Sequence, residues 1–295
     1  MNTEQLNLLR EALPYIQRFK GKTFVVKFSG KVTENKENLA SLTEELALLH
    51  QVGIHVCVIH GGGKQLNELA VKMGVAQTVI DGRRVTDDDT LELAKMIFAG
   101  KINVEILASL RQRGIEAVGL SGVDGNIVQA SKRPPSEIFN RATGETSEID
   151  FGHVGDVLRI NDKLVRVLLE KGYLPVISSL GADDDGHIFN INADTIAAEL
   201  AVSLEAEKLI LLSDVNGVYL DVDKPETKVS RLNANSAHNL IASGAATGGM
   251  IPKLQTMISL LIRGVNSIHI IGGTVKNALL SEVFTDEGTG TMIVK

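Results

Sequence analysis

Residues 54–70 read IHVCVIHGGGKQLNELA. The run 54–59 is short, apolar and rich in β-branched residues, which predicts a strand that is buried on both faces of a sheet. Three glycines, Gly61 to Gly63, follow it, and a helix-forming segment begins at Lys64. A strand, a glycine turn and a helix in this order present backbone N–H groups and a helix N-terminus to an anion. The segment therefore predicts an α/β fold with a phosphate-binding turn.

Predicted strands and helices alternate along the rest of the chain. This alternation favours a three-layer αβα sandwich with a central, mainly parallel sheet. No change of composition marks a linker, so we expect two lobes that share one sheet. Residues 132–148 are polar and predict an excursion or a hairpin. The other predicted strands are 23–28, 115–120, 174–177, 209–212 and 267–271, and the predicted helices include 38–49, 64–73, 86–98, 101–113, 161–171, 195–204, 234–243 and 250–263.

The composition excludes several classes of protein. The chain has 295 residues, a net charge of −6, no Trp and no Lys/Arg-rich stretch, so a nucleic-acid partner is not expected. No apolar run approaches the ~20 residues that a membrane span needs. The first residues lack the features of a signal peptide. The single cysteine, Cys57, lies in a predicted strand and is expected to be a core residue of a cytoplasmic protein.

Two lysines and a second glycine turn add to the phosphate hypothesis. Lys27 stands at the carboxyl end of the first predicted strand, where open α/β sheets bind ligands. Residues 247–250, Thr-Gly-Gly-Met, open the predicted helix that carries Lys253. Each lysine alone could be a solvated surface charge, and each glycine run could be a plain turn. Together on one sheet edge they favour a cradle for a transferring phosphoryl group, although neither a P-loop motif nor a dinucleotide fingerprint is present.

Three polar residues precede the alanine-rich helix. Asn190, Asn192 and Asp194 alternate, so on an extended segment their side chains would share one face. Asn192 is also a candidate helix N-cap. Asp194 is expected to be a buried carboxylate that pairs with a lysine. Arg83 and Arg84 offer either surface charges or a bidentate fork for a substrate carboxylate.

The sequence shows no clustered Ser/His/Asp triad and no Cys/His metal spacing. The absence of a candidate general base is consistent with an acceptor that is already ionised at neutral pH. A carboxylate is such an acceptor, because a free Glu side chain has a pKa of about 4.3. Phosphorylation of a carboxylate needs neutralised charge and alignment rather than proton abstraction.

Six segments of the chain form a specific set of motifs: 58–63 (VIHGGG), 81–86 (DGRRVT), 152–155 (GHVG), 189–194 (FNINAD), 247–253 (TGGMIPK) and 284–288 (FTDEG). Together they resemble the acetylglutamate kinase family of the amino acid kinase superfamily, and the resemblance extends over nearly the whole chain. It implies ATP-dependent phosphorylation of the γ-carboxylate of N-acetyl-L-glutamate, a step of arginine biosynthesis.

The resemblance also implies roles for individual residues. Residues 21–180 would bind the acyl amino acid, and residues 181–295 would bind ATP, whose Mg²⁺ is held mainly by phosphates and water. The catalytic residues would be Lys27, Lys253 and Asp194, with Asp194 orienting both lysines. Substrate would contact Gly62, Gly63, Arg84, Asn190 and Asn192, and ATP would contact Gly30, Ser213, Asp214, Gly248 and Gly249.

Arginine-inhibited members of the family have a kinked N-terminal helix and form hexameric rings of dimers. Residues 1–20, with Pro14, resemble that helix, so we expect a homo-oligomer, either a dimer or a hexamer, and arginine as an effector. The residues at the arginine site would be Tyr15, His269, Glu282 and Gly288. The chain departs from the family pattern at 29–31 (SGK), where two glycines are usual, and at 272–274 (GGT), where Asp-Gly-Arg is usual.

Two other functions stay open at this point. One is a non-catalytic, arginine-binding regulatory homologue, and the presence of Lys27, Asp194 and Lys253 speaks against it. The other is a related kinase with a different carboxylate acceptor. Arg84 with Asn190 favours an amino-acid derivative over carbamate or a nucleotide.

Overall fold

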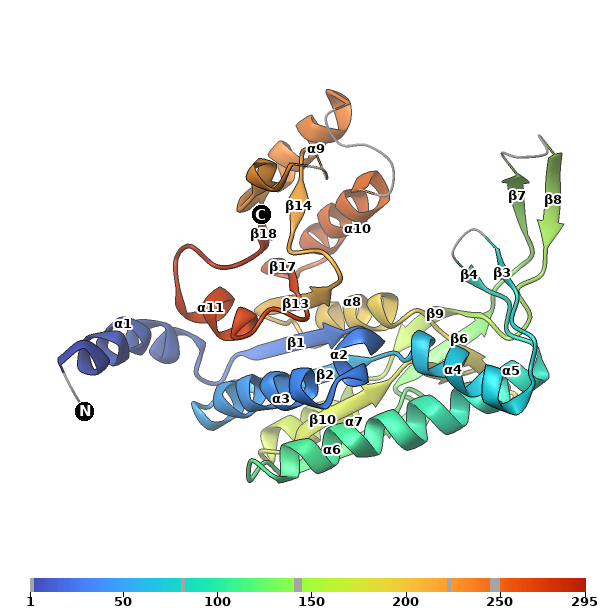
Figure 1. Ribbon diagram of the computed structural model, residues 1–295, viewed down its shortest axis with the longest axis horizontal. Helices are drawn as coiled ribbons and strands as arrows, with labels where there is room; N and C mark the ends of the chain where they lie inside the picture. The colour runs from blue at the N-terminus through green and yellow to red at the C-terminus, as the bar shows by residue number, and fades with distance from the viewer. Residues whose placement is uncertain (1–2, 81–82, 141–144, 222–223, 245–249) are drawn as a thin grey trace.

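The computed structural model describes residues 3–80, 83–140, 145–221, 224–244 and 250–295. Among these residues, eight strands form one central sheet in the order β16-β18-β17-β13-β1-β2-β10-β5 (Figure 1). Every neighbouring pair is parallel except β17 and β18, which confirms the mainly parallel sheet. The strands are β1 (Thr23–Phe28), β2 (His55–His60), β5 (Ala117–Ser121), β10 (Leu174–Ser178), β13 (Lys208–Ser213), β16 (Arg231–Asn233), β17 (Ser267–Gly272) and β18 (Thr291–Val294).

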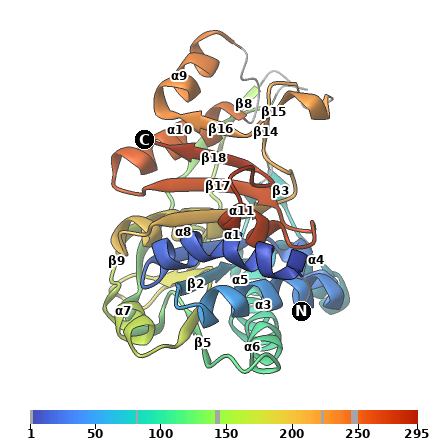
Figure 2. The ribbon, with the colours of Figure 1, turned by 90° about the vertical axis from the view of Figure 1, so that its left-hand side faces the viewer.

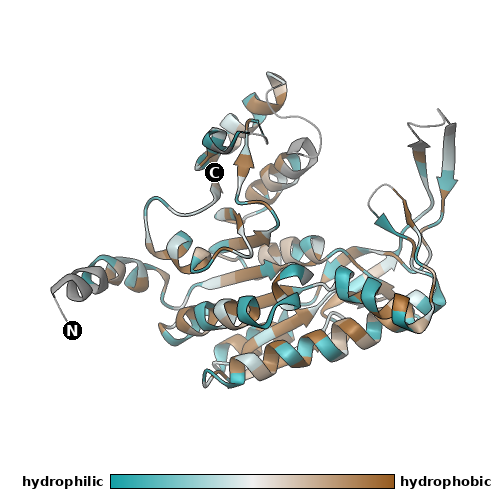
Figure 3. Ribbon diagram, viewed as in Figure 1, coloured by the Kyte–Doolittle hydropathy of each residue, from teal (hydrophilic) through white to brown (hydrophobic). Residues whose placement is uncertain are grey.

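Helices cover both faces of this sheet and complete three layers (Figures 1 and 2). One face carries α3 (Lys36–Gln51), α6 (Asn103–Arg111) and α11 (Ala278–Phe284). The other carries α7 (Lys163–Glu170), α8 (Ala193–Ser203) and α10 (Met250–Ile262). Side chains of β1 alternate between the two cores, with Phe24 and Val26 in one and Val25 in the other. A strand that is buried on both faces needs an unbroken apolar run, and Figure 3 shows hydrophobic residues along the central strands.

A second, four-stranded sheet has the order β12-β11-β6-β9 and was not predicted from the sequence. Its strands are β6 (Val128–Lys132), β9 (Gly155–Ile160), β11 (Leu180–Ala182) and β12 (Ile188–Asn190). β7 (Ser136–Asn140) and β8 (Glu145–Ile149) form the hairpin that the polar segment predicted. The shorter pairs are β3 (Val79–Ile80) with β4 (Arg83–Arg84) and β14 (Val218–Tyr219) with β15 (Lys228–Val229).

The two helices predicted at 86–98 and 101–113 are one continuous helical path. It consists of α5 (Asp88–Lys95), a π-helix (Met96–Ile102) and α6. The break expected near Gly100 is wrong, because the wider π-turn carries the chain through that glycine. α5 begins at its N-cap, Asp87, whose carboxylate accepts the N–H of Thr90 at 2.9 Å.

The remaining helices include the N-terminal one. α1 (Thr3–Phe19) runs through Pro14 without ending, and it contacts α11 (Figure 2). The others are α2 (Gly30–Glu34), α4 (Gly63–Met73), α9 (Ala234–Ala242) and short 3₁₀ turns at Asp124–Asn126 and Pro225–Thr227. Cys57 is fully buried, as expected. No helix in the described ranges is both long enough and apolar enough to cross a membrane.

Candidate active site

Lys27 lies near the carboxyl end of β1, and its ammonium faces the first turn of α8. Its Nζ is 2.7 Å from Oδ1 of Asp194. The side chain of Lys27 is only 13% exposed, so this lysine is not the solvated surface charge that was the simpler alternative. The side chain of Asp194 is 55% exposed, so the prediction of a buried carboxylate is wrong, although the predicted pairing is present. Asp194 lies in the first helical turn, where water reaches the helix end.

Asn190, Asn192 and Asp194 do not share one extended segment. Asn190 ends β12, whereas Asp194 already belongs to α8. Asn192 is the N-cap of α8, and its Oδ1 accepts the N–H of Asp194 at 2.7 Å. The Nδ2 of Asn190 donates to Oγ1 of Thr86 at 3.2 Å. The capping role of Asn192 therefore orients the carboxylate that pairs with Lys27.

The glycine turn at 61–63 joins β2 to α4, as predicted. No acceptor among the described residues hydrogen-bonds to the N–H of Gly62 or Gly63. A Cβ added at Gly62 would lie 2.2 Å from Cδ1 of Ile102 in the π-helix, so no other residue fits there without a shift. The turn thus rests against the π-helix with its first N–H groups available to a ligand.

Arg84 contacts the same turn from the β4 strand. Its guanidinium donates to the side-chain oxygens of Asn67 and Gln77, and its Nη2 donates to the carbonyl of Gly63 at 2.9 Å. Burial lowers the pKa of Arg84. These three bonds use three of the five N–H donors of an arginine. The two remaining donors can still hold a carboxylate beside the turn.

A cavity of about 730 Å³ opens beside the Lys27–Asp194 pair. Residues from β1, β13, α8 and α10 line it, Ser213 among them. Arg83 also lines this cavity. Sequence patterns alone did not separate the role of Arg83 from that of its neighbour Arg84. Lys253 belongs to α10, but its side chain falls outside the described part of the chain, as do Gly248 and Gly249.

Two of the residues that depart from the family pattern, Ser29 and Lys31, contact Asp214 directly after β13. Nζ of Lys31 is 2.8 Å from Oδ2 of Asp214, and Oγ of Ser29 is 3.4 Å from its Oδ1. Gly30 does not form a simple turn here, because it begins α2. Ser29 and Lys31 therefore position Asp214, one of the residues predicted to bind ATP. These two contacts were not predicted from the sequence.

A second cavity, of about 570 Å³, lies between α1, α11 and the end of β18. Tyr15, Glu282 and Gly288 line it. The hydroxyl of Tyr15 donates to Asp286 at 2.5 Å. Gly288 has a φ of +61°, and a Cβ there would lie 2.6 Å from Oε2 of Glu282, so both conformation and space require glycine.

A buried network of charged side chains supports this second cavity. Nδ1 of His269 donates to Glu282 at 2.7 Å, and Nε2 of His269 accepts from Lys208 at 2.9 Å. Burial lowers the pKa of His269 and lowers that of Lys208 to about 8. Burial acts to raise the pKa of Glu282, but hydrogen bonds from His269 and from two backbone N–H groups bring it below its usual value. The four residues predicted for the arginine site therefore lie together.

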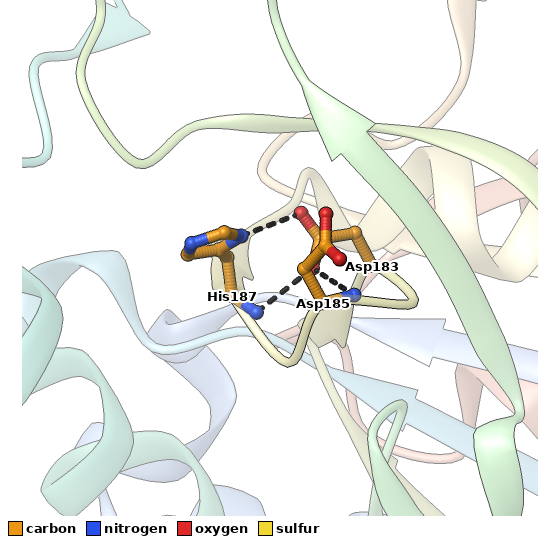
Figure 4. A group of neighbouring side chains, drawn as sticks. All are labelled: Asp183, Asp185 and His187. Carbon is orange, nitrogen blue, oxygen red and sulfur yellow. Dashed lines mark hydrogen bonds and ion pairs between the residues drawn. The ribbon is translucent and has the colours of Figure 1, made fainter.

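The turn between β11 and β12 carries Asp183, Asp185 and His187 (Figure 4). The carboxylate of Asp183 accepts the N–H groups of Asp185 and His187 at 3.1 and 2.8 Å, and it pairs with Nδ1 of His187 at 2.9 Å. These bonds close the hairpin turn, which accounts for the cluster without a metal ion.

Comparison with known proteins extends the structural result. A model of the amino acid kinase family matches residues 22–272. The acetylglutamate kinase of Symbiobacterium thermophilum is 45% identical over 98% of this chain and 97% of its own length. That of Methanocaldococcus jannaschii is 42% identical over 99% of this chain and 97% of its own.

Solved structures share the fold. N-acetylglutamate synthase from Neisseria gonorrhoeae with coenzyme A and N-acetyl-glutamate superposes with a TM-score of 0.80, at 30% identity over 98% of this chain. Its complex with L-arginine gives 0.76 at 26% identity, again over 98% of this chain. This chain covers only 63% and 65% of the synthase in the two complexes. Carbamate kinase from Giardia, 17% identical with a TM-score of 0.65 over 93% of this chain and 99% of its own, shares the fold alone. The matched family model and the identities of 42–45% over nearly the full length place this chain in the amino acid kinase family.

Proposed function

We propose that this protein transfers the γ-phosphoryl group of ATP to the γ-carboxylate of N-acetyl-L-glutamate, the activity named for its relatives. The observation that carries the proposal is the largely buried Lys27 paired with Asp194 at a cavity on the carboxyl side of the sheet. A cation held there by a carboxylate is preorganised for the charge of a transferring phosphoryl group.

The step itself needs only the ionised acceptor and fixed charges. A γ-carboxylate oxygen of the acceptor forms a bond to the γ-phosphorus, and the bond from that phosphorus to the β–γ bridging oxygen breaks, so ADP leaves. Lys27 and Lys253 neutralise the phosphoryl oxygens, and Asp194 orients the ammonium groups. No general base is required because the acceptor is already a carboxylate at neutral pH.

ATP lies against residues 181–295 in this proposal. Ser213, Asp214, Gly248 and Gly249 bind it, and Gly30 approaches its phosphates. In the described part of the site, Asp194 and Asp214 each have a lysine partner, which leaves few carboxylate oxygens for a metal. These residues fit an Mg²⁺ that arrives with ATP and is held by its phosphates and water.

The acyl amino acid lies against residues 21–180. Gly62 and Gly63 offer N–H groups, and Asn190 and Asn192 flank the entry to α8. The remaining donors of Arg84 hold the substrate α-carboxylate beside Gly63.

Replacement of Arg84 by lysine tests that contact. We expect the KM for N-acetylglutamate to rise about tenfold or more, with the KM for ATP changed far less, because an ammonium cannot reproduce a planar fork. Steady-state kinetics with each substrate varied in turn measures both constants. Equal changes in the two would show that Arg84 is structural.

A coupled assay of ADP release tests the proposed activity against its alternatives. N-acetylglutamate, glutamate, aspartate, carbamate and UMP are compared as acceptors at equal concentration. The proposal expects the highest kcat/KM with N-acetylglutamate. A higher value with another acceptor would identify a different kinase, and no release with any acceptor would favour a regulatory homologue.

The second cavity is the proposed effector site for arginine. Its acidic lining, with Glu282, Asp286 and Glu287, suits a guanidinium, while Lys208 suits a carboxylate. The related synthase has been solved with L-arginine, which supports the choice of ligand. The hydroxyl of Tyr15 on α1 donates to Asp286 at the wall of this cavity. Binding of the effector is therefore coupled to the position of the N-terminal helix.

We also propose that α1 assembles dimers into a hexamer. Leu13 on this helix is 47% exposed, and Figure 1 shows the helix extending beyond the sheet. Deletion of residues 1–20 is expected to lower the mass in light scattering to that of a dimer, with much of the activity retained and any arginine inhibition weakened. A truncated protein of the same subunit number as the full chain would contradict this role.

A further inference from the structure

His60 occupies the last position of β2, directly before the glycine turn. Its side chain is fully buried and stacks on Phe28 with ring centroids 6.3 Å apart. Nδ1 lies 3.1 Å from the carbonyl oxygen of Gly61, and Nε2 lies 3.1 Å from Nδ2 of Asn103. Both ring nitrogens therefore have a partner, and one of these is the backbone of the turn.

The surroundings of Asn103 determine which nitrogen of His60 carries the proton. Nδ2 of Asn103 also lies 3.0 Å from the carbonyl of Val176 and 3.3 Å from that of Leu120. Carbonyl oxygens only accept, so the amide nitrogen must point toward them and its oxygen away. Nε2 of His60 faces the same NH₂ group, whose two N–H donors are shared among the three acceptors, so Nε2 accepts. The ring proton is left on Nδ1, which donates to the carbonyl of Gly61.

Burial keeps the ring in this neutral state. It lowers the pKa of His60 to about 4. The imidazole therefore stays uncharged at neutral pH, with one tautomer selected by its partners.

The bond to Gly61 fixes the direction of the next N–H group. In a trans peptide the carbonyl and the following N–H point in opposite directions. With the Gly61 carbonyl held against His60, the N–H of Gly62 points away from the ring, where no described residue accepts it. Free rotation of that peptide would aim the N–H elsewhere.

The π-helix brings both supports under the turn. Asn103 is the first residue after the π-helix, and Ile102 is its last. Ile102 packs against Gly62, and Asn103 bonds to His60. A π-turn changes the register of the residues that follow it, and such turns are frequent at functional sites.

We propose that His60, held as its Nδ1–H tautomer by Asn103, is a positioning residue that aims the N–H of Gly62 at the transferring phosphoryl group or its acceptor. This inference rests on the proposed function, because it needs a ligand at Gly62.

Two variants separate positioning from packing. His60→Asn places an amide N–H near the position of Nδ1 and can still donate to Gly61. His60→Gln places its amide near the position of Nε2 and cannot. Both remove the ring and its stacking on Phe28, so their losses of packing are similar. His55→Gln, at the opposite end of the same strand, is the matched control.

We expect His60→Gln to lower kcat by about 10–100-fold with a smaller change in either KM, since a misplaced donor weakens the transition state most. His60→Asn should recover most of that loss, and His55→Gln should keep the wild-type kcat. Steady-state ADP release gives kcat and KM, and thermal melts check folding. Equal losses in the two His60 variants, or a wild-type kcat in His60→Gln, would overturn the positioning role.

A second measurement does not depend on turnover. Two-bond ¹H–¹⁵N correlation spectra of the wild-type protein with ¹⁵N-labelled histidine report the tautomer of each ring. The proposal requires Nδ1–H for His60, with His60→Asn used to assign the signal, and Nε2–H or a charged ring at pH 7 would overturn it. A wild-type protein without kinase activity would contradict the proposed function instead, and the tautomer would still decide the state of His60.

Discussion

Replacement of Lys27 by alanine is expected to lower kcat for N-acetylglutamate phosphorylation by about 10²–10³-fold, with little change in melting temperature. Lys27 is 13% exposed and 2.7 Å from Asp194, so its charge is fixed in place before the reaction begins. Opposite charges about 4 Å apart interact by roughly 4 kcal/mol at an effective dielectric constant of 20, which is enough for a loss of this size. Steady-state ADP release measures kcat.

Lys101→Ala is the matched control for this variant. Lys101 pairs with Glu105 on the surface of the π-helix and α6, 2.9 Å apart, and each side chain is about half exposed. Loss of an exposed pair should leave kcat within about twofold of the wild type. If Lys27→Ala also stayed in that range, Lys27 would not be at the reacting phosphoryl group.

Replacement of Gly62 by alanine is expected to lower both the melting temperature and kcat. The new Cβ would lie 2.2 Å from Cδ1 of Ile102 and 2.9 Å from Cδ1 of Phe98. Overpacking of this kind costs about 1–3 kcal/mol. At about 2–4 °C per kcal/mol for a chain of this size, the melting temperature should fall by roughly 2–12 °C. Calorimetry measures the shift, and ADP release measures the accompanying loss of turnover.

Gly61→Ala provides the comparison for stability. A Cβ at Gly61 would lie 3.6 Å from Cβ of Ala193, an ordinary contact. Its melting temperature should stay within about 2 °C of the wild type, as is usual without a packing clash. A Gly62→Ala protein as stable as Gly61→Ala would mean that the π-helix does not restrict the turn.

Local sequence signals predicted most of the central sheet. The run 54–59, the three glycines and the helix after them needed only hydrophobic pattern and glycine chemistry, and the structure confirms all three. The second sheet was missed because its strands are short and pair over long separations, as Ala182 does with Gln129. The π-helix was missed because Gly100 resembles a helix end, and only tertiary packing determines the wider turn.

In the candidate site, too, local sequence signals predicted some features, whereas long-range packing determined the others. The sequence predicted a lysine partner for Asp194, and the family resemblance pointed to Lys27, which is the partner observed. The exposure of Asp194 was not predicted, because it depends on where α8 begins. The contact of Lys31 with Asp214 joins α2 to the residue after β13, and these two segments are far apart in sequence. The contact of His60 with Asn103 depends on the register that the π-helix imposes, which no local pattern reveals.

In the proposed reaction, a carboxylate of N-acetylglutamate receives the phosphoryl group. Trapping with hydroxylamine tests it most directly, because hydroxylamine converts an acyl phosphate into a hydroxamate whose mass identifies the acceptor. We expect N-acetylglutamate γ-hydroxamate to form only with ATP, and Lys27→Ala to lower its rate of formation by about 10²–10³-fold. ATP-dependent turnover of N-acetylglutamate without hydroxamate would show that its carboxylate is not phosphorylated. A higher rate of hydroxamate formation from another acceptor would show that N-acetylglutamate is not the substrate.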